Sequence, residues 1–142
     1  MKVSIITVCF NSASTIEETI ISVQSQKYQN IEYIIVDGNS SDSTNDIVSR
    51  YPHVVSHHVS EKDNGLYDAM NKGIRIATGD VIGILNSDDI LASRNTIENL
   101  VRGIGNDDGI YGDVGFYAQS SFSKKKGTIR LLDLIKGNSL EE

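Results

Sequence analysis

Short runs of β-branched and aliphatic residues alternate with amphipathic segments along the first two thirds of the chain. Runs of apolar residues predict strands at 3–8, 31–36, 54–59, 81–85 and 109–111. The run at 54–59 is the weakest, because His57 and His58 interrupt it. Apolar residues at helical spacing, with cap-forming residues before them, predict helices over 14–26, 44–50, 66–77 and 95–103.

This alternation predicts an α/β fold with a mainly parallel, Rossmann-like sheet flanked by helices. Ligands of open α/β sheets bind beyond the carboxyl ends of the strands, so the polar clusters that follow the apolar runs are the candidate site. The apolar periodicity fades after residue 117. We therefore expect a core over 1–117 and an irregular or incomplete segment over 118–142.

The net charge and the cysteine content limit which binding partners and which cellular compartment the sequence favours. The net charge of −6, from 19 acidic and 13 basic residues, argues against a nucleic-acid partner. The single cysteine, Cys9, cannot form a disulfide within the chain, which favours a reducing compartment such as the cytoplasm. No apolar stretch reaches the roughly 18 residues of a membrane span. Peripheral attachment at the inner face of a membrane stays open, and the sequence assigns no oligomeric state.

The adjacent carboxylates of Asp88 and Asp89, just after the apolar run 81–85, are the sharpest chemical feature. Two neighbouring carboxylates repel each other unless a cation lies beside them. Mg²⁺ and Mn²⁺ prefer such oxygen ligands and complete their shells with water and phosphate oxygens. A cap for the following helix is an equally good explanation of this motif taken alone.

Three other polar positions fit either a ligand site or an ordinary structural role. Asp37 follows the run 31–36 and could accept a hydrogen bond from a ribose or a base, or cap the next helix. Asn11 follows the first apolar run in a segment of small and polar residues. Asn71 and Lys72 lie on a helix face that could meet phosphates or simply face solvent.

Taken in order, these segments resemble the family 2 glycosyltransferases, which have a GT-A fold. The segments that carry the resemblance are TVCFN at 7–11, VDGNSSDST at 36–44, DNG at 63–65 with NKG at 71–73 and ATGD at 77–80, and NSDD at 86–89. The last is similar to the family's DxDD metal motif. The resemblance covers residues 1–117, and four motifs in the family's order make it specific.

The resemblance implies a nucleotide-sugar site and a metal. The residues that it places against the nucleotide sugar are Thr7, Cys9, Asn11, Asp37, Asp63, Asn71, Lys72, Asn86, Ser87 and Asp88. Within that set, Asp37 would bind the base, while Asp63, Asn71 and Lys72 would border the nucleotide and its diphosphate. Asp88, assisted by Asp89, would hold Mn²⁺ or Mg²⁺ against the diphosphate leaving group.

Two departures from the family pattern qualify this hypothesis. Asn86 stands where the family usually has Asp, which removes one negative charge from the site. The general base that deprotonates the acceptor of an inverting family member belongs to a later region, and no residue here is assigned that role. The match to the acceptor-binding part is absent, so the chain is expected to be a truncated, weakly active form.

The leading hypothesis is a metal-dependent, inverting glycosyltransferase of surface polysaccharide synthesis. Its donor would be a nucleotide-diphosphate sugar, with a UDP-sugar favoured, and its acceptor a glycan or a lipid-linked sugar. The alternative is a non-catalytic nucleotide-binding or interaction module that has lost the transfer base.

Overall fold

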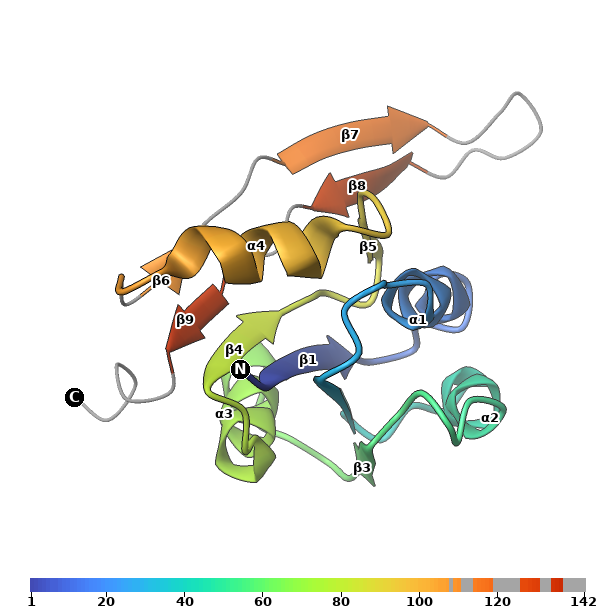
Figure 1. The fold of residues 1–142 in the computed structure, drawn as a ribbon. Coiled ribbons are helices and arrows are strands. Elements are labelled where there is room, and N and C mark those ends of the chain that lie inside the picture. The colour runs from blue at the N-terminus through green and yellow to red at the C-terminus, as the bar shows by residue number, and fades with distance from the viewer. Residues whose placement is uncertain (108, 111–113, 119–125, 131–133, 137–142) are drawn as a thin grey trace.

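The computed structural model describes residues 1–107, 109–110, 114–118, 126–130 and 134–136, and Figure 1 shows how they are arranged. The helices are α1 (Ile16–Gln24), α2 (Thr44–Ser49), α3 (Leu66–Ile76) and α4 (Thr96–Ile104). The strands are β1 (Val3–Cys9), β2 (Ile31–Asp37), β3 (His57–Ser60), β4 (Val81–Ile84), β5 (Asp89–Leu91), β6 (Gly109–Ile110), β7 (Val114–Ala118), β8 (Lys126–Arg130) and β9 (Leu134–Lys136). None of the helices in these ranges is long and apolar enough to cross a membrane.

The main sheet has six strands in the order β3-β2-β1-β4-β9-β6. Strands β3, β2, β1 and β4 run parallel, and β9 lies antiparallel between β4 and β6. The register of β1 and β2 sets Cys9 opposite Asp37, so both strands end at the same edge. The predicted α/β fold with a mainly parallel sheet is confirmed. A second, three-stranded sheet has the order β5-β8-β7 and lies above the first in Figure 1.

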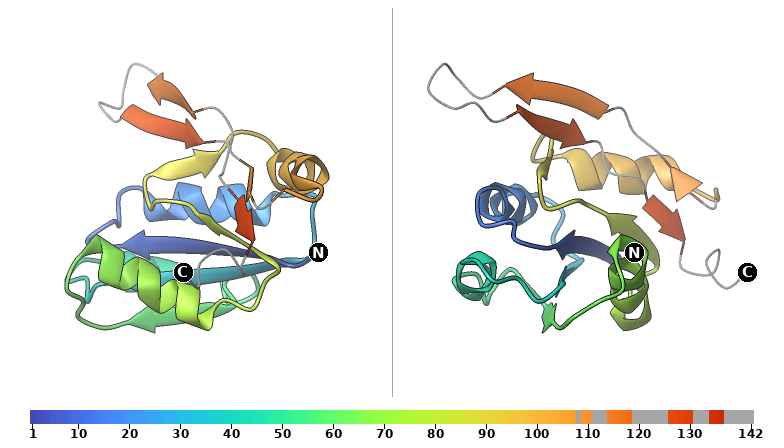
Figure 2. Two further views of the ribbon diagram at one scale, coloured as in Figure 1. Left: turned by 90° about the vertical axis from the view of Figure 1, so that its left-hand side faces the viewer. Right: turned by 180° about the vertical axis from the view of Figure 1, so that it is seen from behind.

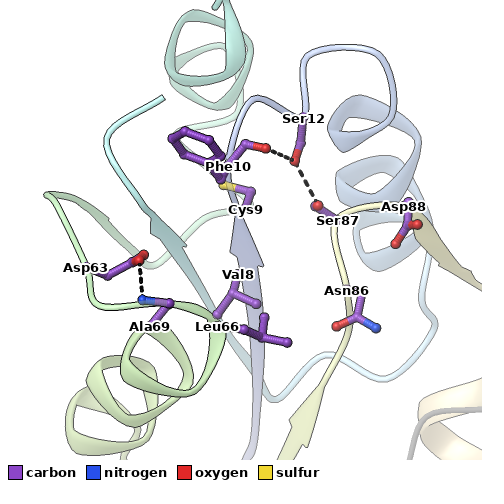
Figure 3. A pocket seen from close by; sticks show the side chains of 11 residues that line it. Val8, Cys9, Phe10, Ser12, Asp63, Leu66, Ala69, Asn86, Ser87 and Asp88 are labelled. Atoms are coloured by element: carbon purple, nitrogen blue, oxygen red, sulfur yellow. Dashed lines mark hydrogen bonds between the residues drawn. The ribbon is translucent and has the colours of Figure 1, made fainter. Parts of the chain in front are cut away.

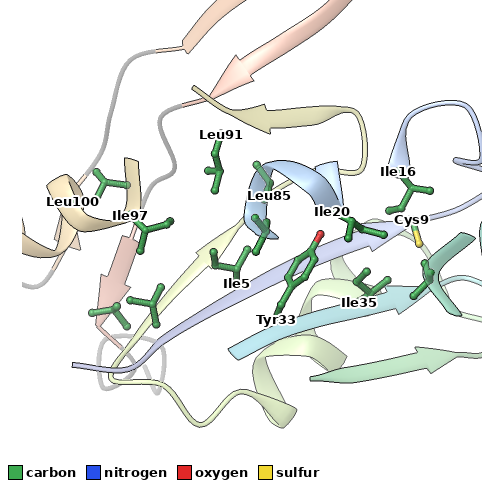
Figure 4. Close-up of a cluster of buried hydrophobic side chains, with 14 of the residues drawn as sticks. Ile5, Cys9, Ile16, Ile20, Tyr33, Ile35, Leu85, Leu91, Ile97 and Leu100 are labelled. Atoms are coloured by element: carbon green, nitrogen blue, oxygen red, sulfur yellow. The ribbon is translucent and has the colours of Figure 1, made fainter. Parts of the chain in front are cut away.

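Helices cover both faces of the parallel sheet, as the two views of Figure 2 show. Successive side chains of a strand point to opposite faces, so every second residue of β1 and β2 meets the same helices. Ile5, Tyr33 and Ile35 pack with α1, α2 and α4 in one core cluster, which Figure 4 draws. Ile6 and Ile34 pack on the other face in the cluster that contains residues of α3.

Strands β3, β5, β8 and β9 differ from the sequence expectation. The amide groups of Val54 and Val55 donate to the carbonyl of Tyr51 at 3.1 and 3.0 Å, forming a tight turn, so the strand begins only at His57. Strand β5 was not predicted. Strands β8 and β9 lie within the segment expected to be irregular, and β9 pairs with β4. The boundary at residue 117 stays a prediction.

A buried carboxylate joins the strands at the amino edge of the sheet, opposite the candidate site. Glu32 is 4% exposed and accepts hydrogen bonds from the Ser4 hydroxyl and from the Thr78 amide and hydroxyl at 2.8 and 2.9 Å. The Lys2 ammonium lies 3.5 Å away. Burial alone would raise the pKa of Glu32, but these hydrogen bonds outweigh it and lower the pKa from 4.5 to about 2. Thr78, the second residue of the ATGD segment, therefore has a structural role.

Replacing Glu32 with Gln is expected to lower the free energy of unfolding at pH 7 by about 2–3 kcal/mol. The pKa is depressed in the folded state, so the stabilisation is complete above pH 4.5 and is lost as the pH falls through about 2. Urea denaturation at pH 7 and at pH 3 measures both effects. A wild-type advantage that stays the same at both pH values would contradict this account.

Candidate functional site

A pocket of about 460 Å³ opens at the carboxyl edge of the sheet, between the ends of β1 and β4. Strand β1 lies between β2, the next strand in the sequence, and β4. The direction in which successive strands are added to the sheet therefore reverses at β1. Ligands of open α/β sheets bind at such switch points. The residues that line the pocket are Val8, Cys9, Phe10, Ser12, Asp63, Gly65, Leu66, Ala69, Asn86, Ser87 and Asp88.

The two carboxylates of the pocket lie on opposite sides of it, as Figure 3 shows. Asp63 comes from the loop before α3, and Asp88 comes from the turn after β4. Val8 and Cys9, at the end of β1, lie between these two walls. A ligand in this pocket would therefore meet one carboxylate at each side and an apolar strand end beneath it.

The turn that carries Asp88 is fixed from the side of α1. The hydroxyls of Ser12 and Ser87 are 2.9 Å apart, which joins the segment after β1 to the segment after β4. The Thr19 hydroxyl lies 3.1 and 2.7 Å from the carbonyl oxygens of Ser87 and Asp89. These contacts hold the backbone on both sides of Asp88, whose own side chain is exposed.

Asp89 differs from Asp88 in its surroundings. It is 2% exposed, forms the start of β5, and does not line the pocket. Its amide donates to the Asn86 carbonyl at 3.1 Å, which closes the turn that presents Asp88. The sequence treated the two aspartates as one pair, whereas the structure turns only the first toward the pocket. The metal role of Asp89 stays a prediction.

Asp37 lies behind the pocket. Its side chain has no exposed surface and does not line the cavity. Its oxygens accept hydrogen bonds from the Ser40 amide at 2.9 Å, from the Asn45 side chain at 2.9 Å and from the Ser60 hydroxyl at 2.7 Å. The Ser40 hydroxyl also donates to it. Burial would raise the pKa of Asp37, but these hydrogen bonds hold it below its usual value.

Cys9 lines the pocket but is no nucleophile. Its side chain is 7% exposed, and its sulfur lies 3.7 Å from Asp37 Oδ1. Burial, followed by the nearby negative charge of Asp37, raises the pKa of the Cys9 thiol well above its usual range. A thiol that keeps its proton at neutral pH cannot attack as a thiolate. Cys9 therefore contributes shape and an apolar surface.

Thr7 and Asn11 hold the fold around the pocket without lining it. Thr7 is buried, and its hydroxyl lies 2.9 Å from that of Tyr33. Asn11 has a φ of 48°, a left-handed conformation that asparagine tolerates. Its side-chain oxygen accepts a hydrogen bond from the Ser41 amide at 2.9 Å, which ties the segment after β1 to the one after β2.

Asn71 and Lys72 lie on α3 and do not line the pocket. The Lys72 ammonium forms ion pairs with Glu61 at 3.1 Å and with Asp68 at 3.5 Å. The hydrogen bond to Glu61 is the largest of the effects that raise the pKa of Lys72 above its usual value. This cation is therefore neutralised by Glu61 in the loop before α3 and by Asp68 on α3 itself. The predicted contact of Lys72 with a diphosphate stays a prediction.

Residues 4–140 match the model of the family described as "Glycosyl transferase family 2". The chain belongs to this family. An uncharacterized glycosyltransferase of Mycobacterium tuberculosis is 36% identical over 103 residues, which are 72% of this chain and 39% of that protein. The chain thus spans about two fifths of the length of the curated relatives that it matches first.

Two solved structures show the same arrangement of the fold. The mannosyltransferase PcManGT of Pyrobaculum calidifontis, in complex with GDP-Man and Mn²⁺, has a TM-score of 0.74 and 27% identity, covering 79% of this chain and 35% of that one. TarS 1-349 of S. aureus, in complex with UDP-GlcNAc, has a TM-score of 0.71 and 24% identity, covering 78% and 34%. The GT-A-like fold of this family 2 member is therefore established.

The donor atoms at the pocket of this family 2 member fit a partial metal site. Asp88 offers a carboxylate, and the amide oxygen of Asn86 is of the same hard type. No group of three or more His, Cys, Asp or Glu side chains in the described ranges could hold an ion by itself. Mg²⁺ is usually bound by one or two carboxylates together with phosphates and water. The residues thus fit an ion that arrives with, or is completed by, a phosphate ligand.

The sequence missed the apolar half of the pocket. Phe10 is 63% exposed and Leu66 is 54% exposed, and both line the cavity. An aromatic residue at the end of an otherwise buried strand was a usable signal for Phe10, because such a position is otherwise expected to be polar. Nothing in the sequence pointed to Ser12, since its contact with Ser87 joins residues 75 positions apart.

Proposed function

We propose that the pocket binds the nucleotide part of a nucleotide-diphosphate sugar together with Mn²⁺ or Mg²⁺, as the donor site of a glycosyltransferase. The observation that carries this proposal is the cavity at the switch point, with Asp88 at its metal side and Asp63 at the other. PcManGT, which shares the fold, was crystallised with GDP-Man and Mn²⁺. TarS was crystallised with UDP-GlcNAc.

Asp88 would hold the ion, with Asn86 beside it, while the diphosphate supplies further oxygen ligands. A divalent ion bound there neutralises negative charge that develops on the diphosphate as the sugar–phosphate bond breaks. The protein's part is to keep Asp88 in place before the donor arrives. The hydrogen bonds from Thr19 to the carbonyl oxygens of Ser87 and Asp89 do this.

Inversion at the anomeric carbon, a glycan or lipid-linked acceptor and a role in surface polysaccharide synthesis are proposed on family resemblance. Asp63 and Asp88 are the only carboxylates among the described residues that line the pocket. With Asp88 on the ion and Asp63 toward the nucleotide, a general base for the acceptor would have to come from outside this set of residues. The proposed site therefore accounts for donor binding and leaving-group stabilisation.

The binding of UDP should depend on the metal, and the binding of the metal should depend on UDP. Because the described residues offer only a partial shell, we expect Mn²⁺ alone to bind weakly and to bind at least about tenfold more tightly when UDP is present. Isothermal titration calorimetry of UDP with Mn²⁺ and with EDTA measures this coupling. Failure of UDP to bind below millimolar concentrations with Mn²⁺ present would refute the proposed function.

A further inference from the structure

Asn64 and Gly65 form the only Asn–Gly pair of the sequence, and they lie in an exposed bend between β3 and α3. The side chain of Asn64 has no hydrogen-bond partner among the described residues, so it is free to rotate. Gly65 has a φ of 110°, and no described atom lies within 4 Å of the place that a Cβ would occupy. The side-chain carbonyl carbon of Asn64 can therefore reach the backbone nitrogen of Gly65 without hindrance.

A carboxylate is already bonded to that backbone nitrogen. The Gly65 amide donates to Asp63 Oδ1 at 2.9 Å, which is within the reach that a general base needs to take up a proton. Other groups anchor the chain on both sides. The Asn64 amide donates to Asp68 Oδ2 at 3.0 Å, and the Gly65 carbonyl accepts from the Ala69 amide at 3.1 Å. Neither of these contacts occupies the Gly65 nitrogen or the Asn64 side chain.

We propose that Asn64 is a site of spontaneous deamidation, in which Asp63 acts as the base. The Gly65 nitrogen attacks Cγ of Asn64 and forms a new C–N bond, while its proton passes to Asp63 Oδ1. The bond from Cγ to the side-chain nitrogen then breaks, and Asp63 returns the proton to that nitrogen, which leaves as ammonia. The product is a succinimide ring. Water opens the ring at either carbonyl, which leaves aspartate or isoaspartate at position 64.

This reaction changes one wall of the pocket, because Asp63 and Gly65 both line it. In the succinimide the Gly65 nitrogen carries no hydrogen, so Asp63 loses the donor that orients its carboxylate. In isoaspartate the main chain runs through the side-chain carbon, which adds one methylene between Asp63 and α3. Either final product also adds a negative charge beside Asp63. Weaker binding of UDP with Mn²⁺ is the expected result, a consequence that rests on the proposed function.

The Asn39–Ser40 pair provides an internal comparison. Asn39 is exposed like Asn64, and the Ser40 amide also donates to a carboxylate, Asp37 Oδ2, at 2.9 Å. Ser40, however, carries a side chain and is half-buried. Asn39 should therefore react at least about tenfold more slowly than Asn64, which corresponds to a barrier higher by about 1.4 kcal/mol.

The test incubates the protein at mildly alkaline pH and follows residues 39 and 64 by peptide mapping with mass spectrometry that separates aspartate from isoaspartate. The wild type should convert at Asn64 with release of ammonia. Asn64→Gln should not convert at this rate, because its ring would need one more atom. Asp63→Asn keeps an acceptor for the Gly65 amide but lacks the base, so conversion at Asn64 should slow by at least about tenfold. Thermal melting confirms that both variants are folded.

The outcomes separate the modification from its effect on the pocket. If Asn64 stays intact for as long as Asn39 does, the proposal fails. Equal rates at Asn64 in the wild type and in Asp63→Asn would refute the role of Asp63 as the base.

Calorimetry with UDP and Mn²⁺, before and after incubation, measures the consequence for binding. The wild type should lose affinity as Asn64 converts, whereas Asn64→Gln should keep its affinity over the same time. Equal UDP affinity of the fresh and the converted wild type would refute the effect on the pocket. If even the fresh protein binds no UDP with Mn²⁺, the proposed function fails, while conversion at Asn64 still supports the modification site.

Discussion

Replacing Asp88 with Asn is expected to weaken the Mn²⁺-dependent binding of UDP by about 100-fold or more. Loss of a residue that merely supports a metal ligand typically costs about 10–100-fold in metal affinity, and Asp88 would be a ligand itself. The substitution keeps the size of the side chain and removes its charge. Because Asp88 is exposed, the fold should be unaffected, with a change in unfolding free energy within about 0.5 kcal/mol.

Calorimetry with UDP in the presence of Mn²⁺, and again with EDTA, measures this effect. The small metal-independent part of UDP binding should be equal in the two proteins, because it does not involve Asp88. Asp46→Asn is the matched control, since Asp46 is an exposed aspartate on α2 and does not line the pocket. Full Mn²⁺-dependent affinity in Asp88→Asn would mean that the ion is held elsewhere.

The same substitution at Asp89 distinguishes the roles of the two aspartates of the NSDD segment. Its side chain is buried in β5, so Asp89→Asn should act mainly on stability and on the position of the turn. The sequence could not distinguish these two neighbours, because both follow the same apolar run. Their difference arises from β5, a three-residue strand that pairs with β8 almost 40 positions later.

The parallel sheet could be predicted because the patterns that indicate its strands and helices lie within short segments of the sequence. Each of β1, β2 and β4 is a short apolar run, and apolar residues recur at helical spacing in α1, α3 and α4. The pairing of β9 between β4 and β6 was not predictable in the same way. Strand β9 has three residues, too few for a periodic pattern, and its place depends on partners that lie far away in the sequence.

The sequence assigned the candidate residues to the carboxyl edge of the sheet, but it could not tell which of them line the pocket. Cys9, Asp63, Asn86, Ser87 and Asp88 line the pocket, and their contact with a nucleotide sugar stays a prediction. A strand-end position tells which edge a residue occupies, whereas its exposure depends on which other groups pack around it. The serines and the asparagine that surround Asp37 come from the loop after β2, from α2 and from β3, and no local pattern announces that they converge.

Replacing Asp37 with Asn is expected to lower the free energy of unfolding by about 2–4 kcal/mol. The buried carboxylate accepts hydrogen bonds from the Ser40 amide, the Asn45 side chain and the Ser60 hydroxyl. An asparagine there would turn an NH₂ group toward donors that are already present. A hydroxyl can rotate away, but a backbone amide cannot, so at least one buried donor loses its partner.

The pH dependence of the destabilisation tests whether the charge of the Asp37 carboxylate is its cause. Hydrogen bonding holds the pKa of Asp37 below its usual 3.8, so its stabilisation is complete above that pH and is lost as the pH falls through the lower folded-state value. The gap in unfolding free energy between wild type and Asp37→Asn should therefore be largest at neutral pH and should narrow below pH 3.8. Urea denaturation at several pH values measures it, with Asp46→Asn as the exposed control.

The Asp37→Asn variant also tests which contacts hold the end of β1, where Cys9 lines the pocket. Cys9, which lines the cavity, lies 3.7 Å from Asp37 Oδ1, and the Gly38 amide donates to the Cys9 carbonyl at 2.9 Å. A loosened Asp37 should therefore weaken UDP binding through the shape of the strand end. An Asp37→Asn protein with wild-type stability would show that the buried hydrogen bonds around this carboxylate do not support the fold.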